Sequence, residues 1–330
     1  MATLKEVAKL CGVTPATVSY ILNGRHLDRM LPETIQRVRE AAVKLDYRPH
    51  PSARSLVTGR TEAIGIFCPG HLEEVWKDSY LLDVMLGIFY QAAQDRYAVQ
   101  VATDDLLAED RRQQPAVDGW VAVMSHEPVP TSIRGARPTV YFDAYHNFED
   151  GPCYWADNAR AGEVAGKFCA DRGLRAAFVL PLPLAECPFA YQERWRGFRE
   201  SFGARKDLLH SEPYFLPLRD GSELQGETPP ACEALRAKKI DVLVTSTDLL
   251  GYQILRDVKK MGIQIPRDGK LIGIDNLPQS RWVDPALSSV DIGALELGRQ
   301  TARQLLARLQ KKEAPFEPAP PKLIERQTSA

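Results

Sequence analysis

The sequence predicts a small all-α unit at the amino terminus, followed by a larger α/β body built from parallel sheets. Residues 3–56 contain three short helical patterns and no alternating strand pattern. From residue 62 onward, short β-rich runs alternate with helical stretches, which is typical of βαβ units whose sheets are covered on both faces. With 330 residues, of which 44% are hydrophobic, the chain is long enough to bury more than one core.

The first helix is expected at residues 4–10. Thr3 and Glu6 have the T-x-x-E spacing of a capping box, in which each side chain accepts a hydrogen bond from a free backbone N–H at the start of a helix. Gly12 then marks a tight turn, because glycine adopts positive φ without steric cost. The sequence therefore predicts a short helix that ends at a sharp change of direction.

A second helix is expected at Pro15–Leu22, since Thr14 is a natural N-cap and Pro15 a natural first helical residue. Its apolar residues fall on one face, and small or polar residues are left on the other. A third helix at residues 33–45 also keeps one face apolar. Two short helices joined by a glycine turn, the second with small or polar groups outward, form a helix-turn-helix.

The charge of the chain is unevenly distributed. Residues 1–60 contain ten Lys or Arg and five Asp or Glu, a net charge of +5. The whole chain has a formal charge of −1, so residues 61–330 carry −6. A basic head on an acidic body favours a polyanionic partner for the head, because Lys and Arg near a phosphate backbone release its counterions.

Several short segments of the head match one known family in order and register. They are Leu4-Lys5-Glu6-Val7-Ala8, Gly12-Val13-Thr14, Ala16-Thr17-Val18-Ser19, Leu22-Asn23-Gly24, residues 34–39, Tyr47-Arg48-Pro49 and Ala53-Arg54-Ser55-Leu56. With these segments the chain resembles the lactose/galactose repressor (LacI/GalR) family of bacterial transcription regulators. The resemblance continues, with weaker motifs, to Arg326 and so covers nearly the whole chain.

The resemblance implies that the second helix lies in the major groove of double-stranded operator DNA. Ala16 can meet a thymine methyl group, and the Tyr20 hydroxyl can form a hydrogen bond with a base edge. Tyr20 stands where many relatives have Arg or His, so no operator sequence is carried over, and an exposed aromatic without DNA contact is the alternative. The DNA contacts expected in the head are Thr14, Pro15, Ala16, Thr17, Ser19, Tyr20 and Asn23.

Residues 49–60 resemble the hinge helix and linker of the family. Two such hinges, meeting in a homodimer over a minor groove, would fold together on DNA, with Leu56 wedged between base steps and Arg54 near a phosphate. His50 replaces the usual Asn of the family. The alternative is a proline-rich linker in which Leu56 packs at a domain junction. The expected hinge contacts are Ser52, Ala53, Arg54 and Leu56.

The body resembles the two-lobe fold of periplasmic binding proteins, with the ligand between the lobes. The resemblance gives a helix-turn-helix DNA-binding domain at 1–48, a hinge and linker at 49–60, and an effector-binding and dimerisation domain at 61–330. Lobe one takes about 61–156 and 291–318, and lobe two about 157–290 and 319–330. Strands are expected at residues 63–68, 99–102, 119–124, 139–142, 176–180, 241–246, 270–274 and 322–325, and helices at 81–96, 158–172, 191–201, 230–238, 248–261 and 294–309.

Polar residues at expected strand ends are candidate ligand contacts, because ligands of open α/β sheets lie outside the carboxyl ends of the strands. Arg194 falls at the ligand-binding arginine of the family, and a guanidinium facing carboxylates suits the vicinal hydroxyls of a sugar. The alternative for Asp157, Asp248 and Asp275 is a capping role. The expected effector contacts are Asp143, Trp155, Arg194, Thr247, Asp248, Asp275 and Trp282, and a stacking platform is left open among Trp282, Trp155, Phe67 and Tyr191.

The sequence thus predicts a DNA-binding transcription regulator, in the first place a repressor, controlled by a small metabolite that is a sugar or sugar derivative. The alternatives are a corepressor-dependent regulator or activator that senses a nucleobase or other metabolite, and, in a different class, a non-regulatory ligand-binding protein or an enzyme on the same body. In the family the helix expected at 81–96 helps to form a dimer. No leucine-heptad tail follows residue 309, so a homodimer is expected.

Other kinds of site find no support in the sequence. No GxGxxG or GxxxxGK loop follows an expected strand, so no nucleotide cofactor is expected. The six cysteines have no CxxC spacing, and we expect buried thiols in a reducing cytoplasm and no metal site. The six histidines form no group suited to nucleophilic catalysis, so no catalytic residue and no enzyme activity are expected. We expect no signal segment and no membrane span.

Overall fold

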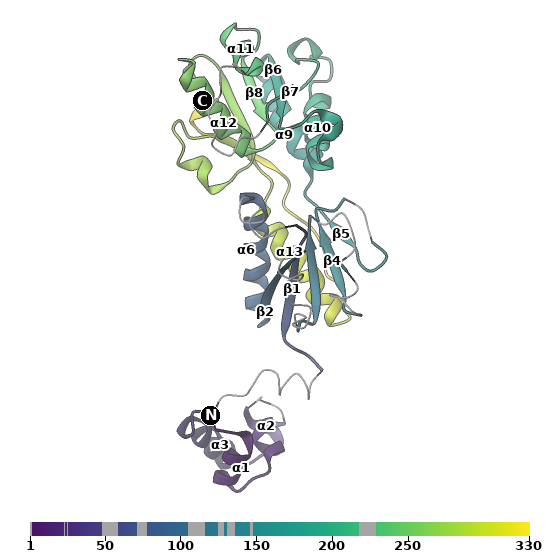
Figure 1. Ribbon diagram of the computed structural model, residues 1–330, viewed down its shortest axis with the longest axis vertical. Coiled ribbons are helices and arrows are strands. Elements are labelled where there is room, and N and C mark those ends of the chain that lie inside the picture. Colours follow the sequence, from purple (N-terminus) through teal and green to yellow (C-terminus); the bar gives the residue numbers. More distant parts are fainter. Residues whose placement is uncertain are drawn as a thin grey trace. The chain divides into compact units, whose positions relative to one another are not determined.

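A computed structural model describes residues 2–22, 24, 26–47, 59–70, 78–104, 116–124, 129–130, 136–145, 148–217 and 229–330. The chain forms two compact units, a head at Met1–Glu62 and a body at Ala63–Ala330 (Figure 1). Most of the expected hinge at 49–60 lies outside the described residues, as do Arg48 and Asn23.

The head is a three-helix unit, as the sequence predicts. Thr3 and Glu6 form the expected capping box: the Thr3 N–H donates to Glu6 Oε2 at 2.7 Å, and Glu6 N–H donates to Thr3 Oγ1 at 3.4 Å. Gly12 has a φ of 65°, and Thr14 Oγ1 accepts a hydrogen bond from Thr17 N–H at 3.1 Å. The elements are α1 (Leu4–Cys11), α2 (Pro15–Leu22), a 3₁₀ turn η1 (Leu27–Arg29) and α3 (Pro32–Lys44), around a core of Val7, Ala8, Cys11, Val18, Ile21, Val38, Ala41 and Ala42.

The first sheet of the body is parallel throughout, in the order β2-β1-β3-β4-β5. Helices α6 (Ser79–Gln94) and α13 (Ala294–Leu309) lie together against one face of it (Figure 1). Its strands are β1 (Ala63–Cys68), β2 (Ala98–Thr103), β3 (Gly119–Val123), β4 (Thr139–Phe142) and β5 (Cys153–Tyr154).

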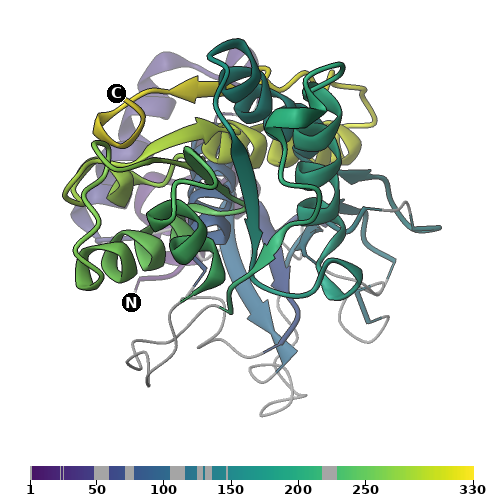
Figure 2. The same cartoon turned by 90° about the horizontal axis from the view of Figure 1, so that it is seen from above.

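The second sheet has the order β11-β10-β9-β8-β6-β7, and all its pairs are parallel except that of the carboxyl-terminal strand β11 with β10. This yellow strand lies at the sheet edge in Figure 2. The strands are β6 (Ala176–Leu180), β7 (Tyr214–Phe215), β8 (Val242–Thr245), β9 (Lys270–Asp275), β10 (Ser288–Asp291) and β11 (Lys322–Ile324). The helices around it are α9 (Asn158–Asp171), α10 (Phe189–Ser201), α11 (Pro230–Arg236) and α12 (Asp248–Lys260), with short 3₁₀ turns η2 (Leu184–Glu186), η3 (Lys206–Leu208), η4 (Pro278–Arg281) and η5 (Gln327–Ser329).

Helices cover both faces of the second sheet, which explains its continuous apolar strands. Along β6, Phe178 belongs to one core cluster with Trp195 and Phe198 of α10. The neighbouring Val179 belongs to a different cluster with Leu250 of α12. The strand is buried at every residue because its side chains alternate between these two cores.

Three strands were not predicted: β5, β7 and β10. The first two have only two residues each, too short for a recognisable pattern. Strand β10 begins with Ser288 and Ser289, both fully buried, so it lacks an apolar signature. Their hydroxyl groups satisfy internal partners: Ser288 pairs with Ser329 Oγ at 2.7 Å, and Ser289 donates to Asp248 Oδ1 at 2.5 Å.

Helices α9 and α10 approach each other closely because both carry glycine at their contact. A Cβ added to Gly162 would lie 1.9 Å from the carbonyl oxygen of Arg194, and one added to Gly197 would lie 1.9 Å from that of Ala159. Neither position has room for a side chain. The close approach brings Arg194 of α10 beside Asn158 at the start of α9.

Helix α6 buries only part of its apolar surface. Met85 is buried, whereas Leu86 is 52% exposed. The buried face is formed by Leu81, Val84, Met85, Gly87, Ile88, Gln91 and Ala92. Leu86 and Tyr90, which is also 52% exposed, therefore point away from the core of the lobe.

Candidate functional site

The outer surface of α2 presents the residues that the sequence predicts as DNA contacts. Pro15, Ala16 and Tyr20 are exposed, and Thr17 and Ser19 are half-buried, while Val18 and Ile21 on the opposite face fill the core of the head. Tyr20 is 42% exposed, and its ring lies edge-on to that of His26 with a centroid separation of 5.1 Å. The expected contacts Asn23, Ser52, Ala53, Arg54 and Leu56 lie outside the described residues.

The body contains a cavity of about 410 Å³ at the carboxyl ends of strands from both sheets. Met124 and Asp143 follow strands β3 and β4 of the first sheet, and Thr247 and Asp275 stand at the ends of β8 and β9 in the second. This is where ligands of open parallel sheets bind. Asp143, Arg194, Thr247 and Asp275, which the sequence predicts as effector contacts, all line it.

Arg194 is the buried cation of the cavity, with 3% of its surface exposed. Its Nη1 lies 2.9 Å from Asp275 Oδ1 and donates a hydrogen bond to the Ser246 carbonyl oxygen at 2.5 Å. Its Nε donates to Asn158 Oδ1 at 2.8 Å. The planar guanidinium is therefore fixed in orientation by three elements of the second lobe.

Asp143 is the corresponding buried anion of the first lobe. Tyr80 donates its hydroxyl hydrogen to Asp143 Oδ2 at 2.6 Å, and Tyr145 donates to Oδ1 at 3.2 Å. Burial raises the pKa of Asp143 to about 6, although the hydrogen bond from Tyr80 acts in the opposite direction. Burial also raises the pKa of the Asp275 carboxyl, and the nearby Arg194 opposes that rise.

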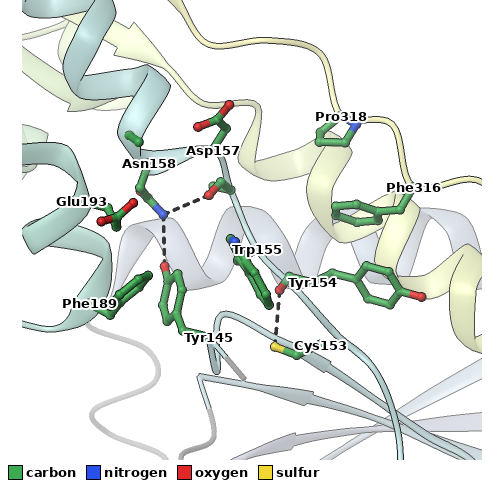
Figure 3. A pocket seen from close by; sticks show the side chains of 12 residues that line it. Tyr145, Cys153, Tyr154, Trp155, Asp157, Asn158, Phe189, Glu193, Phe316 and Pro318 are labelled. Atoms are coloured by element: carbon green, nitrogen blue, oxygen red, sulfur yellow. Dashed lines mark hydrogen bonds between the residues drawn. The ribbon is translucent and has the colours of Figure 1, made fainter. Parts of the chain in front are cut away.

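Asn158 connects these two groups through hydrogen bonds. Its Nδ2 donates to the Tyr145 hydroxyl at 3.1 Å and to the Ala156 carbonyl at 3.1 Å, and its Oδ1 accepts from Arg194. Figure 3 shows the amide nitrogen between its two acceptors. A continuous series of hydrogen bonds thus runs between the lobes through Tyr80, Asp143, Tyr145, Asn158 and Arg194.

Several strand ends at the cavity have left-handed backbone geometry without glycine. Met124, Asp143 and Tyr145 have φ values of 52°, 56° and 60°, and Asp275 has a φ of 124°. Such conformations cost of the order of 1–3 kcal/mol each and persist where the surroundings fix them. Here Asp143 N–H donates to the Tyr154 carbonyl at 2.8 Å, and its side chain is fixed by two tyrosines. The strained turns direct these side chains to the cavity.

Asp248 does not reach the cavity, contrary to expectation. Its carboxylate is fully buried and accepts hydrogen bonds from Leu277 N–H at 2.8 Å and from the Ser280 and Ser289 hydroxyls at 2.7 and 2.5 Å. It therefore ties α12 to β10 and η4 inside the second lobe. Thr247 caps α12 instead, accepting from Leu250 N–H at 3.3 Å.

Most of the aromatic residues that the sequence offers as ligand contacts do not line the cavity. Trp282 is 83% exposed and lines no part of it, and Phe67 is buried in the first lobe. Trp155 lines a neighbouring pocket of about 400 Å³ with Phe189 and Phe316 (Figure 3). Of the four stacking candidates, Tyr191 alone lines the cavity.

Asp157 has the capping role that was its alternative: it is the N-cap of α9, and its Oδ1 accepts a hydrogen bond from Arg160 N–H at 2.9 Å.

The sequence did not indicate several of the cavity residues, among them Asp78, Tyr80, Tyr145 and Phe189. Asp78 caps α6, accepting from Leu81 N–H at 3.0 Å, and an aspartate just before an apolar helix was a usable signal. Tyr145 follows the predicted strand-end Asp143 by two residues. Nothing in the sequence indicated that Tyr80 would face Asp143 across 63 positions.

Other sites find no support in the described part of the chain. No three His, Cys, Asp or Glu side chains there are arranged to hold a metal ion. All six cysteines are buried free thiols, as predicted. Among the described residues, no helix combines the length and apolar character needed to cross a bilayer.

Residues 3–50 match the model of the bacterial regulatory proteins of the lacI family, and residues 168–329 match that of the periplasmic binding protein-like domain. The chain joins a lacI-family DNA-binding domain to a periplasmic-binding-protein-like domain. The family prediction and the predicted fold class, a helical head on an α/β two-lobe body, are confirmed. This lacI-family chain is a DNA-binding transcription regulator, and the family is not enzymatic.

Known proteins are similar to this chain over most or all of its length. The HTH-type transcriptional repressor PurR of Escherichia fergusonii is 28% identical over 100% of this chain and 97% of its own. The HTH-type transcriptional regulator CelR of Thermobifida fusca is 25% identical over 93% of this chain and 92% of its own.

Solved structures of lacI-family proteins share the fold. The complex of the transcriptional regulator CelR with cellobiose matches with a TM-score of 0.62 and 22% identity over 100% of both chains. The lac repressor dimer bound to operator and the anti-inducer ONPF matches with a TM-score of 0.73 and 18% identity over 99% of both chains.

The raised pKa of Asp143 predicts how stability depends on pH. The native state holds this proton more tightly than the unfolded chain, so the contribution of Asp143 is present below pH 3.8 and is lost as the pH rises towards about 6. We expect Asp143→Asn to make the fall of unfolding free energy with pH shallower in this window, by up to about 1 kcal/mol per pH unit.

Urea denaturation between pH 4 and 7 measures this slope. All five tryptophans lie in the body, so their fluorescence reports its unfolding without a contribution from the head. Asp171→Asn, at an exposed carboxylate, is the control. Equal slopes for wild type and Asp143→Asn would contradict the assignment.

Proposed function

We propose that this lacI-family regulator represses transcription as a homodimer on a near-palindromic operator, and that a sugar or sugar derivative in the body cavity controls its affinity for DNA. The main support for a sugar effector is the buried Arg194, which Asn158 and Asp275 hold in a cavity lined by both lobes. A guanidinium and carboxylates in fixed geometry suit hydroxyl groups, which both donate and accept.

The surface of α2 supports the base-reading role of Tyr20. Its exposed aromatic side chain stands with Ala16 on the outward face of the second helix of a helix-turn-helix. In this class of domain the second helix enters the major groove. A tyrosine hydroxyl can donate to or accept from a base edge, and Ala16 suits a thymine methyl group.

The exposed apolar residues of α6 and α13 support a two-fold assembly. Leu86 and Tyr90 of α6 and Leu295 of α13 are 52%, 52% and 42% exposed. Clustered exposed apolar side chains mark interaction surfaces, and a two-fold operator requires a two-fold protein. The solved lac repressor structure, similar in fold, is a dimer bound to operator.

Two solved relatives support a sugar as effector. One is the complex of CelR with cellobiose, and the other is a lacI-family regulator of Enterococcus faecium with bound ribose. A ligand that contacts both lobes binds one closure state more tightly than another, and so shifts the population of states. Closure would change the spacing of the two hinges across the dimer. Such coupling typically changes affinity by roughly 5- to 150-fold.

Replacement of Tyr20 tests the head. We expect Tyr20→Ala to change the base preference at one position of each half-site, because a base-edge contact is worth about 1–3 kcal/mol of discrimination. Binding-site selection from random duplexes, with wild type and variant in parallel, measures this preference. Arg29→Ala, which removes an exposed cation outside α2, is the control and should keep the wild-type profile. An unchanged profile for Tyr20→Ala would rule out base reading by this residue.

Replacement of Arg194 tests the cavity. A thermal-shift screen of sugars, sugar derivatives and nucleobases should find a metabolite that raises the melting temperature, because a ligand specific for the folded state stabilises it by mass action. Arg194→Gln should abolish this shift together with the effect of the metabolite on operator affinity. Arg196→Gln, two residues along α10 with a side chain 45% exposed, should keep both. A shift that persists in Arg194→Gln would place the effector elsewhere.

A further inference from the structure

The cavity wall carries more anionic than cationic side chains. Asp78, Asp143 and Asp275 line it, whereas Arg194 is the single cationic side chain among its described lining residues. A ligand enclosed here loses water and meets this charge at low dielectric, so its own charge strongly affects its affinity. The net negative charge of the cavity wall therefore constrains the chemical class of the effector.

Arg194 does not offer two free guanidinium nitrogens with which to bind an anion from the cavity. Its Nε is committed to Asn158 Oδ1 at 2.8 Å, and its Nη1 donates to the Ser246 carbonyl at 2.5 Å while lying 2.9 Å from Asp275 Oδ1. The positive charge is thus already compensated by a buried carboxylate. Asp78 and Asp143 remain without a cation within 4.0 Å among the described residues.

Hydrogen-bond donors of the wall are also largely consumed. The hydroxyl hydrogens of Tyr80 and Tyr145 both point to Asp143, so the two hydroxyl groups can only accept; the Tyr145 oxygen already accepts one hydrogen bond, from Asn158 Nδ2 at 3.1 Å. The carboxylate of Asp275, which is only 7% exposed, lies 2.9 Å through Oδ1 from Arg194 Nη1, and it adds acceptor oxygens but no donor to the wall. The cavity therefore offers mainly acceptors and requires a ligand rich in donors.

Aromatic rings complete the wall with partly negative faces. Tyr80, Tyr145, Phe189 and Tyr191 line the cavity, and the rings of Tyr145 and Phe189 pack at a centroid distance of 5.1 Å. The face of such a ring attracts a cation, and the attraction strengthens where water is excluded. The guanidinium of Arg194 already lies over the Tyr191 ring, 5.6 Å from its centroid, so the other three rings are the ones that can receive a ligand cation. Acceptors, carboxylates and ring faces all favour the same kind of ligand.

We propose that the effector carries a protonated amine on a polyhydroxylated ring, as an amino sugar does, and that the cavity rejects sugar phosphates and other anions. This inference rests on the proposed function, since it refines the chemical class of the ligand in the same cavity. The ammonium group would lie among Asp78, Asp143 and the tyrosine oxygens, with ring hydroxyls directed to Asp275 and Arg194. The raised pKa of Asp143 agrees with a wall that gains stability from a bound cation.

The test compares ligands that differ in one substituent. Glucose, galactose, mannose and ribose are each measured beside an amino derivative and a phosphate ester by isothermal titration calorimetry, up to about 10 mM of ligand. We expect at least one amino member to bind about tenfold or more tightly than its neutral parent, and no phosphate ester to bind as well as that parent.

A pair of matched variants links the preference to the wall. Asp78 and Asp157 both cap helices of the body, and asparagine caps as well as aspartate, so Asp78→Asn and Asp157→Asn should both fold. Asp78 lines the cavity, whereas Asp157 is exposed outside it. Asp78→Asn should reduce the ratio of amine to parent affinity several-fold, and Asp157→Asn should leave it unchanged.

The other outcomes separate this inference from the proposed function. If a neutral sugar or a phosphate ester binds as tightly as every amino derivative and changes operator affinity, the amine inference is wrong and the regulatory function stands. The inference is equally wrong if no amino derivative binds, or if Asp78→Asn leaves the ratio unchanged. A protein that selects no duplex sequence at all would instead overturn the proposed function.

Discussion

The buried side chain of Asn158 makes the interaction on which the geometry of the cavity depends. Its amide nitrogen donates to Tyr145, which belongs to the first lobe, and its oxygen accepts from Arg194 in the second. A carboxamide can donate through its nitrogen and accept through its oxygen without introducing a charge. Because the residue is only 4% exposed, loss of either partner would leave a polar group unsatisfied away from water, at a cost of about 1–3 kcal/mol.

The rest of the body supports this connection. The glycine contacts between α9 and α10 bring the backbone of Arg194 against Gly162, one turn from Asn158, and Arg194 Nε donates to the Asn158 amide oxygen at 2.8 Å. On the other side, Asp143 holds Tyr145 in place from a left-handed strand end. A ligand bound among these groups contacts both lobes, and its binding energy is therefore sensitive to their separation. That sensitivity is what an effector needs in order to bias two conformations of a regulator.

Much of this architecture could be predicted from the sequence because its signals are local. The capping box at Thr3, the N-cap at Thr14 and the apolar run of β6 each depend on neighbours within a few positions. Arg194 and Asp143 were found through the family resemblance and the strand ends. The role of Tyr80 could not be predicted, because it depends on a contact 63 residues away. Asp248 was assigned wrongly for a similar reason: its three donors come from segments 29 to 41 residues further along, which turn its carboxylate into the core of the lobe.

The most direct test of this account is a double-mutant cycle between the two partners of Asn158. Tyr145 and Arg194 share that amide, so Tyr145→Phe and Arg194→Lys should be coupled in the free energy of unfolding of the body, measured by urea denaturation of both single variants and the double variant. We expect an interaction energy of about 0.5–3 kcal/mol, as for residues in one hydrogen-bond network. Additivity within about 0.3–0.5 kcal/mol would show that the lobes are not joined through this residue and would contradict the account.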